Sequence, residues 1–94
     1  MSIEKSNKTL NALRDRLRSE DDEIIKKLII RMDIVRDIGL LKQAQGIEIF
    51  DPAREAFNRE RSRAISSGKL PTAMVDQVTD VLAHWARDIQ RPLK

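Results

Sequence analysis

The feature that most constrains the fold is an uninterrupted run at the start of the chain. Residues 1–38 contain neither Pro nor Gly, and Gly39 is the first residue of either kind. Apolar side chains recur there at intervals of three and four, which is the period of a helix and not of a strand. The run therefore predicts one long helix, beginning near Asn7 or Thr9 as the cap and ending between Ala44 and Gly46.

Two shorter helices follow. Residues 47–50 predict a brief irregular connection, and Asp51-Pro52 is a strong helix start because Asp accepts from free amides and Pro fits the first helical position. This second helix should run to about Ser66 and end at residues 67–69, and a third should open at residues 70–72 and close at Pro92. The third carries an apolar stripe at helical spacing: Met74, Val75, Val78, Val81, Leu82, Trp85 and Ile89. The prediction is an all-α fold, with residues 1–94 as a single domain.

The predicted first helix is too long for its own chain. About 35 residues give a rod of roughly 50 Å, whereas a compact domain of this size is only about 33 Å across. Two short helices would leave much of the rod's apolar face uncovered. We therefore expect an intertwined homodimer in which a second copy runs alongside. The alternative is a break near residues 19–22 that gives a monomeric four-helix bundle.

Composition narrows the classes of function. The 94 residues include no Cys and one His, His84, so a Cys-based zinc site or a multi-histidine metal cage is not expected. No stretch approaches the length of a signal-peptide core or a membrane span, which predicts a cytoplasmic protein without a membrane partner. The net charge of +3 is mildly basic, but aromatics at 3% offer little for base stacking, so nucleic acid is not an expected partner.

Charged residues interrupt the apolar seam of the first helix. Alternating steps of four and three from Leu10 give Leu10, Arg14, Leu17, Asp21, Ile24, Leu28, Arg31, Val35, Ile38 and Lys42. A buried cation needs an anionic partner. Asp21 fits a structural role, and Arg14 or Lys42 alone could extend to water near the helix ends. Arg31 lies mid-seam, and three cations facing a core indicate a pocket for an anionic ligand.

Helical geometry relates these cations to one another. Arg31 and Lys42 point within about 20° of each other and lie about 16 Å apart along the axis, so their long side chains can converge on one small molecule. Arg14 lies about 25 Å from Arg31, too far to share that ligand within one straight helix. In an antiparallel dimer, Arg14 of one chain could reach the pocket of the other.

The second and third helices add further candidates. Arg54 and Glu55 lie in the first turn after the Asp51 cap. A cation is mildly unfavourable at a helix N-terminus, so Arg54 is better explained by a bound carboxylate, which the free amides would also attract. Gln90 lies beside the apolar stripe of the third helix and by itself would be taken as a surface residue.

Several spaced motifs together resemble the all-helical, type II class of chorismate mutases. They are ALRDRL with Arg14, IIRMDIVRDIGLLK with Arg31 and Lys42, DPARE with Asp51, Arg54 and Glu55, and the late Gln90. The resemblance extends from about Leu10 to Gln90. It implies three helices per chain, an intertwined dimer with paired long helices, and two active sites built from both chains. The substrate would be a small dicarboxylate, and no cofactor is required.

The resemblance also implies roles for these residues. Arg14 from the partner chain and Arg31 would clamp the substrate carboxylates, while Lys42 and Gln90 would donate to the ether oxygen on which negative charge develops. Lys42 would also lie near a carboxylate. Guanidinium groups suit carboxylates by bidentate bonding, and an ammonium suits a point of developing charge.

Three further residues complete the implied site. Asp51, through its backbone, and Glu55 would contact the ring hydroxyl, and Arg54 would support the site. One departure is Ala86, where these mutases often carry a small hydroxyl residue four positions before the late Gln.

Other functions stay open. The RMD after Ile30, the His84-Trp85 pair and Gln90 are similar to the isochorismate-pyruvate lyases of salicylate and siderophore synthesis, which lack an acid at the position of Glu55. A third branch rearranges 4-amino-4-deoxychorismate, whose amino group would also suit Glu55. A non-enzymatic helical dimer of the same fold is the remaining alternative.

Overall fold

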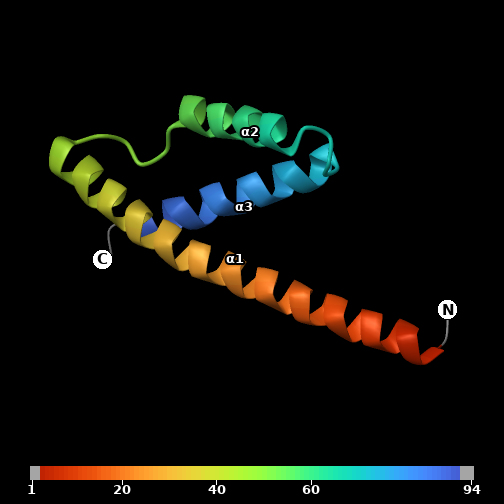
Figure 1. Cartoon of the computed structure of the whole chain (residues 1–94). Helices are drawn as coiled ribbons and strands as arrows, with labels where there is room; N and C mark the ends of the chain where they lie inside the picture. Colours follow the sequence, from red (N-terminus) through yellow and green to blue (C-terminus); the bar gives the residue numbers. More distant parts are fainter. Residues whose placement is uncertain (1–2, 92–94) are drawn as a thin grey trace. The chain divides into compact units, whose positions relative to one another are not determined.

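The chain is built from three helices (Figure 1). The computed structural model describes residues 3–91, with side chains described from residue 9 onwards. The helices are α1 (Ile3–Gln45), α2 (Pro52–Ser66) and α3 (Thr72–Gln90), and residues 3–91 contain no strand. This confirms the predicted all-α, three-helix fold. Pro92, predicted to close the third helix, lies outside the described residues.

The first helix differs from its prediction at the N-terminal end. It begins at Ile3, so the predicted start at Asn7 or Thr9 is wrong by about one turn. Residues 3–9 contain no Pro or Gly that would end a helix. The helix is also continuous through residues 19–22, which contradicts the alternative of a break there and a four-helix bundle.

The structure divides into two units, residues 1–31 and 32–94. In the first unit, the described residues belong to α1, and its large apolar side chains are mostly exposed. The exposed members are Leu10, Leu13, Leu17, Ile24, Ile25, Ile29 and Ile30, each between 44% and 62% exposed. The predicted seam is therefore uncovered within this unit.

Local rules explain where the helices of the second unit end and begin. At the end of α1, Gly46 adopts φ +66°, its N–H donates to the Gln43 carbonyl, and the Ile47 N–H donates to the Lys42 carbonyl at 2.8 Å. This is a Schellman motif, which satisfies carbonyls left unpaired at a helix end. The predicted Asp51 cap of α2 is confirmed, because its Oδ1 accepts from the Arg54 N–H at 3.0 Å.

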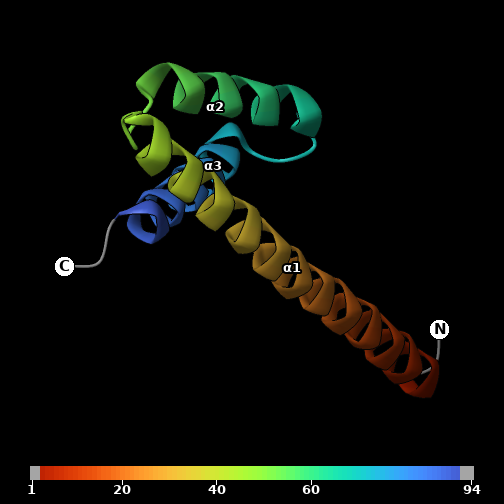
Figure 2. The same cartoon turned by 90° about the vertical axis from the view of Figure 1, so that its left-hand side faces the viewer.

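Helices α2 and α3 run antiparallel and side by side, joined by a short loop (Figures 1 and 2). Ion pairs fasten them together. Arg63 donates from Nε and Nη2 to the two oxygens of Asp76 at 2.8 and 2.7 Å, and one turn along Arg59 pairs with Asp80. The hydrogen bonds from Arg63 hold the pKa of Asp76 below its ordinary value, so this carboxylate stays charged against the opposing effect of burial.

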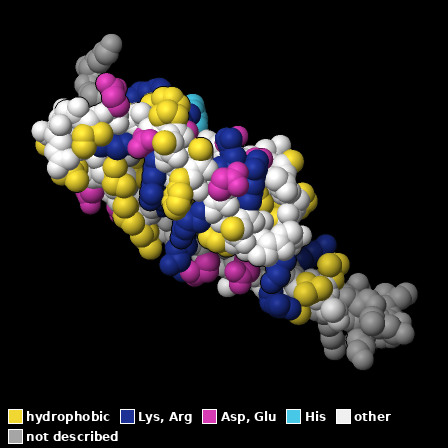
Figure 3. Space-filling view, turned by 90° about the horizontal axis from the view of Figure 1, so that it is seen from above, with side chains coloured by type: hydrophobic (Ala, Val, Ile, Leu, Met, Phe, Trp, Pro, Cys, Tyr) yellow, Lys and Arg dark blue, Asp and Glu magenta, His cyan; other side chains and the backbone are white. Residues whose placement is uncertain are grey.

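The apolar core of the chain is small. Among the described residues, only Val35 and Val75 are buried hydrophobic side chains, at 5% and 6% exposure. Members of the predicted α3 stripe such as Val78 and Trp85 remain 53% and 40% exposed. In the space-filling view, hydrophobic side chains lie at the surface among charged ones (Figure 3). Within residues 3–91, no helix combines the length and the apolar character needed to cross a membrane.

Candidate functional site

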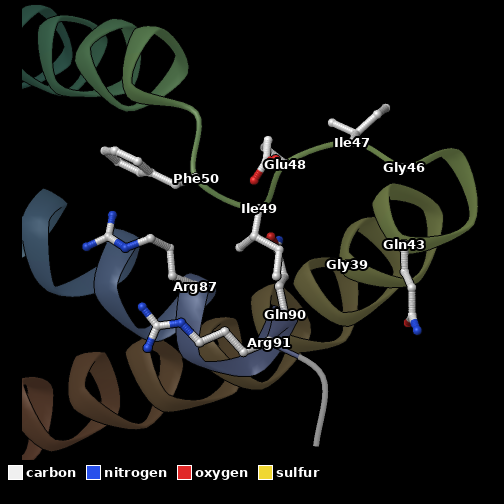
Figure 4. Close-up of a pocket in the computed structure, with 10 residues that line it drawn as sticks. All are labelled: Gly39, Gln43, Gly46, Ile47, Glu48, Ile49, Phe50, Arg87, Gln90 and Arg91. Carbon is white, nitrogen blue, oxygen red and sulfur yellow. The ribbon is translucent and has the colours of Figure 1, made fainter.

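A cavity of about 380 Å³ opens in the second unit, beside the end of α1. It lies between the C-terminal turns of α1, the connection that leads to α2, and the last turn of α3 (Figure 4). Its walls are formed by Gly39, Gln43, Gly46, Ile47, Glu48, Ile49, Phe50, Arg87, Gln90 and Arg91. The volume suits a small organic molecule.

Gln90 is the predicted site residue that lines the cavity directly. Its Nε2 donates to the Val35 carbonyl at 3.3 Å, and the side chain is half-buried. The position next to it on α1 is Gly39, where an added Cβ would lie 2.8 Å from Gln90 Cγ and 3.2 Å from its Cα. Gly39 thus lets α3 approach the backbone of α1 closely, because an added Cβ would force Gln90 and the end of α3 to shift.

Lys42 is held against the connection that forms another wall of the cavity. Its Nζ donates to the Ile49 carbonyl at 2.9 Å, and its own carbonyl accepts from Ile47 in the turn that ends α1. Both ends of this residue therefore fix residues 47–49 to α1. The ammonium carries three N–H donors, so two remain after the bond to Ile49.

Asp51 and Arg54 lie just beyond the cavity, at the start of α2. The carboxylate of Asp51 serves as the helix cap, and its backbone carbonyl accepts from the Glu55 N–H at 3.0 Å. The guanidinium of Arg54 lies over the Phe57 ring, 5.0 Å from its centroid, and the side chain is exposed. The ring gives this cation a partner on its own helix, and the bound carboxylate expected near Arg54 stays a prediction.

Glu55 faces an arginine that the sequence analysis missed. The Nη1 of Arg87 donates to both carboxylate oxygens of Glu55, and the two side chains are only 26% and 30% exposed. These hydrogen bonds raise the pKa of the Arg87 guanidinium above its ordinary value, against the effect of burial. One signal was available in the sequence: Arg87 lies three positions before Gln90, which places both on one face of the helix.

Arg14 and Arg31 belong to the first unit, residues 1–31. Arg14 is exposed and Arg31 is half-buried. In the second unit, Gln90 lines the cavity, while Lys42 and Glu55 each contact a lining residue, Ile49 and Arg87 respectively. The roles of Arg14 and Arg31 stay predictions.

The cavity walls carry charged side chains of both signs. Arg87 and Arg91 are cations and Glu48 is the one carboxylate among the lining residues. Each of these arginines pairs with an acid outside the lining: Arg87 with Glu55, and Arg91 with Asp88 at 3.1 Å. Counted with these paired acids and Lys42, the cavity carries three cations and three carboxylates, so the anionic ligand expected from the sequence stays a prediction. Among the residues that the structure describes, no three His, Cys, Asp or Glu side chains gather to hold a metal ion.

Fold and site together define a small all-helical protein with a cavity, lined by both apolar and charged side chains, at the meeting of two helix ends. The chain belongs to the chorismate mutase type II family, whose model matches residues 13–91. This confirms the family suggested by the sequence motifs. The chain is 33% identical over 81 residues to the T-protein of Enterobacter agglomerans, an alignment that covers 84% of this chain. It spans 21% of the length of that relative. No solved structure matched the chain.

Proposed function

We propose that the protein is a chorismate mutase, which rearranges chorismate to prephenate without a cofactor. The observation that carries the proposal is the placement of Gln90 in the cavity wall, with Lys42 fixed to the adjoining connection. In this reaction a C–O bond breaks as a C–C bond forms within one molecule. The protein's task is to hold the compact substrate conformer and to stabilise charge on the ether oxygen.

The hydrogen bonds around the cavity leave donors for this task. Gln90 uses one amide N–H on the Val35 carbonyl and retains the other. Lys42 uses one of three donors on Ile49 and retains two, enough for the ether oxygen and one carboxylate. Because the bonds to Val35 and Ile49 already orient both groups, little reorganisation is required when charge develops.

Glu55 keeps a capacity to accept a hydrogen bond from the ring hydroxyl. Arg87 engages both of its oxygens through one nitrogen, and each carboxylate oxygen has a further lone pair. The backbone of Asp51 adjoins it at the start of α2. In this proposal these groups select the hydroxyl, and Arg54 supports the start of the helix.

We further propose that the active form is a homodimer in which Arg14 of each chain completes the site of the other, with Arg31 as a second carboxylate clamp. The support is the row of exposed apolar side chains on residues 10–30, since a helix with this face open to water needs a partner. In keeping with the family, the proposed setting is aromatic amino acid biosynthesis in the cytoplasm.

Hybrid dimers test the shared site. Arg14→Ala and Gln90→Ala should each abolish most activity alone. Each mixed dimer would contain one site in which both residues are intact. After subunit exchange, an equal mixture should therefore recover about a quarter of wild-type activity, because half of the dimers are mixed and one of two sites works. No recovery from well-folded, exchanged dimers would refute the sharing.

A second candidate function is isochorismate-pyruvate lyase, favoured by the lyase-like tail HWARDIQ, residues 84–90. Purified protein offered chorismate and isochorismate separately distinguishes the two. Prephenate from chorismate with no salicylate from isochorismate supports the mutase, and the reverse supports the lyase. A helical dimer without enzymatic function would turn over neither substrate.

The assigned residues are tested in the same assay. Arg31→Ala and Lys42→Ala should each lower turnover by about 10²-fold or more, since each removes a preorganised cation from the reacting molecule. Near-normal turnover in both variants would count decisively against the proposed site.

A further inference from the structure

The ion pair between Glu55 and Arg87 differs from the other pairs that join α2 to α3. In the pairs Arg63–Asp76 and Arg59–Asp80, the cation belongs to α2 and the acid to α3. At the cavity the order is reversed, so that the acid is on α2 and the cation, Arg87, is on α3. The reversal places a guanidinium in the cavity wall, where the other two pairs do not reach.

Arg87 is held in that wall from two sides. Besides its bonds to Glu55, its guanidinium lies over the Phe50 ring, 5.3 Å from the centroid, and Phe50 is itself a lining residue. Figure 4 shows the Arg87 side chain extending from α3 on the side of the cavity where Phe50 lies. A cation stacked on a ring and hydrogen-bonded to a carboxylate has little freedom to leave.

This arrangement changes what Glu55 offers a ligand. A carboxylate without a cation would attract a positively charged amino group through a strong charge-assisted hydrogen bond. With Arg87 bonded to both oxygens, that charge is already balanced, and an ammonium group would meet the guanidinium at close range. A neutral hydroxyl donates to a remaining lone pair of Glu55 without this repulsion.

We propose that Arg87 is a specificity-determining residue, which makes the cavity select a substrate with a neutral hydroxyl over one with a charged amino group at the ring position facing Glu55. The inference rests on the proposed mutase function and deepens it by assigning the substrate class. It favours chorismate over 4-amino-4-deoxychorismate. Helix dipoles also favour Glu55 in a first turn and Arg87 in a last turn, so a purely structural pair is the competing explanation.

The test compares kcat/KM for chorismate and 4-amino-4-deoxychorismate near pH 7 in the full chain. The wild type should prefer chorismate by at least about 10-fold. Arg87→Met keeps an unbranched apolar stem but removes the guanidinium and its charge, and should shift the ratio toward the amino substrate by about 10-fold or more. Arg87→Lys keeps the charge and should leave the ratio near the wild-type value.

Two further variants separate this role from others. Arg91→Met removes the other lining cation, which pairs with Asp88, and should not move the ratio. Adding Glu55→Gln to Arg87→Met removes the carboxylate and should cancel most of the shift. Circular dichroism and size-exclusion chromatography establish that each variant is folded, and the wild-type ratio alone tests the proposal if Arg87→Met does not fold.

The outcomes are distinct. A wild type that uses both substrates equally well, or an unchanged ratio in folded Arg87→Met, overturns the inference and leaves the mutase function standing. An equal rise in KM for both substrates in Arg87→Met would instead assign Arg87 to a carboxylate that they share, which also overturns it. If the wild type turns over neither substrate, the proposed function itself fails.

Discussion

Replacing Gly39 by Ala tests the close approach between α1 and α3 that positions Gln90. An alanine Cβ would lie 2.8 Å from Gln90 Cγ, 3.1 Å from its Cβ and 3.2 Å from its Cα. Because the Cα belongs to the backbone of α3, a rotamer change of the side chain alone does not relieve every contact. We expect the end of α3 and the Gln90 amide to be displaced.

Two opposing effects set the change in stability. Alanine favours the helix over glycine by about 1 kcal/mol, whereas overpacking of a close contact costs typically about 1–3 kcal/mol. The net destabilisation should therefore be about 0–2 kcal/mol, or a fall in Tm of up to roughly 15 °C for a chain of this size. The fold should survive the substitution.

The effect on catalysis should be larger. Moving Gln90 Cγ from 2.8 Å to the ordinary contact distance of 3.4 Å requires a shift of about half an ångström. Misplacement by 1 Å typically costs about 10²-fold in rate, so a loss of about 10-fold in kcat is expected. The change in KM should be small because the carboxylate-binding groups lie elsewhere.

Steady-state kinetics and thermal unfolding of Gly39→Ala measure both quantities. Gly68→Ala is the matched control, since Gly68 has φ +73° and no atom within 4 Å of an added Cβ. It should lose about 1–2 kcal/mol of stability through backbone strain, with kcat unchanged. Full activity in Gly39→Ala, or an equal loss of kcat in Gly68→Ala, would show that the contact with Gln90 does not position a catalytic group.

Three other predictions concern different parts of the molecule. Lys42→Met should lower kcat by about 10²-fold, because a donor to the developing charge is lost. The control Lys69→Met, on the exposed loop, should leave kcat unchanged. An equal effect of both substitutions would contradict the proposed role of Lys42 in catalysis. The hydrogen bonds from Arg63 lower the pKa of Asp76, so the stability that Asp76 contributes is present above its ordinary pKa and is lost as the pH falls below about 4. Asp76→Asn should therefore flatten the dependence of Tm on pH in that range. The control Asp15→Asn, at an exposed residue, should leave this dependence unchanged. If the protein is a dimer, its Tm should fall when the protein is diluted. Sedimentation should identify the concentration range in which the dimer dissociates. A Tm that does not change over that range would show that the exposed apolar face does not stabilise the fold.

The helices and their ends were largely predictable because local chemistry decides them. Asp51-Pro52 started a helix where the capping rules placed it, and Gly46 ended one through its left-handed backbone. The start at Ile3 was missed because a capping residue was expected where the chain simply continues as helix. Gln90 and Lys42 were assigned to a site through motif resemblance; Gln90 lines the cavity and Lys42 bonds to the lining residue Ile49, while their roles stay predictions.

The partners of Glu55 and Gly39 were beyond sequence reasoning. Glu55 and Arg87 are 32 residues apart, and their pairing depends on the register between α2 and α3. Gly39 reads in sequence as a weak point in a helix, and only the approach of Gln90 shows why a side chain does not fit there. A pairing between distant residues depends on how helices pack, which local propensities do not specify.

The sequence by itself determined three helices, the Asp51 cap of the second and the spacing of the cations, because backbone propensity and helical period act over a few residues. Tertiary structure decided that Gln90 meets the backbone of α1, that Lys42 fixes the connection, and that Arg87 balances Glu55. These are consequences of packing between helix surfaces, where the shape and charge of both partners set which side chains meet.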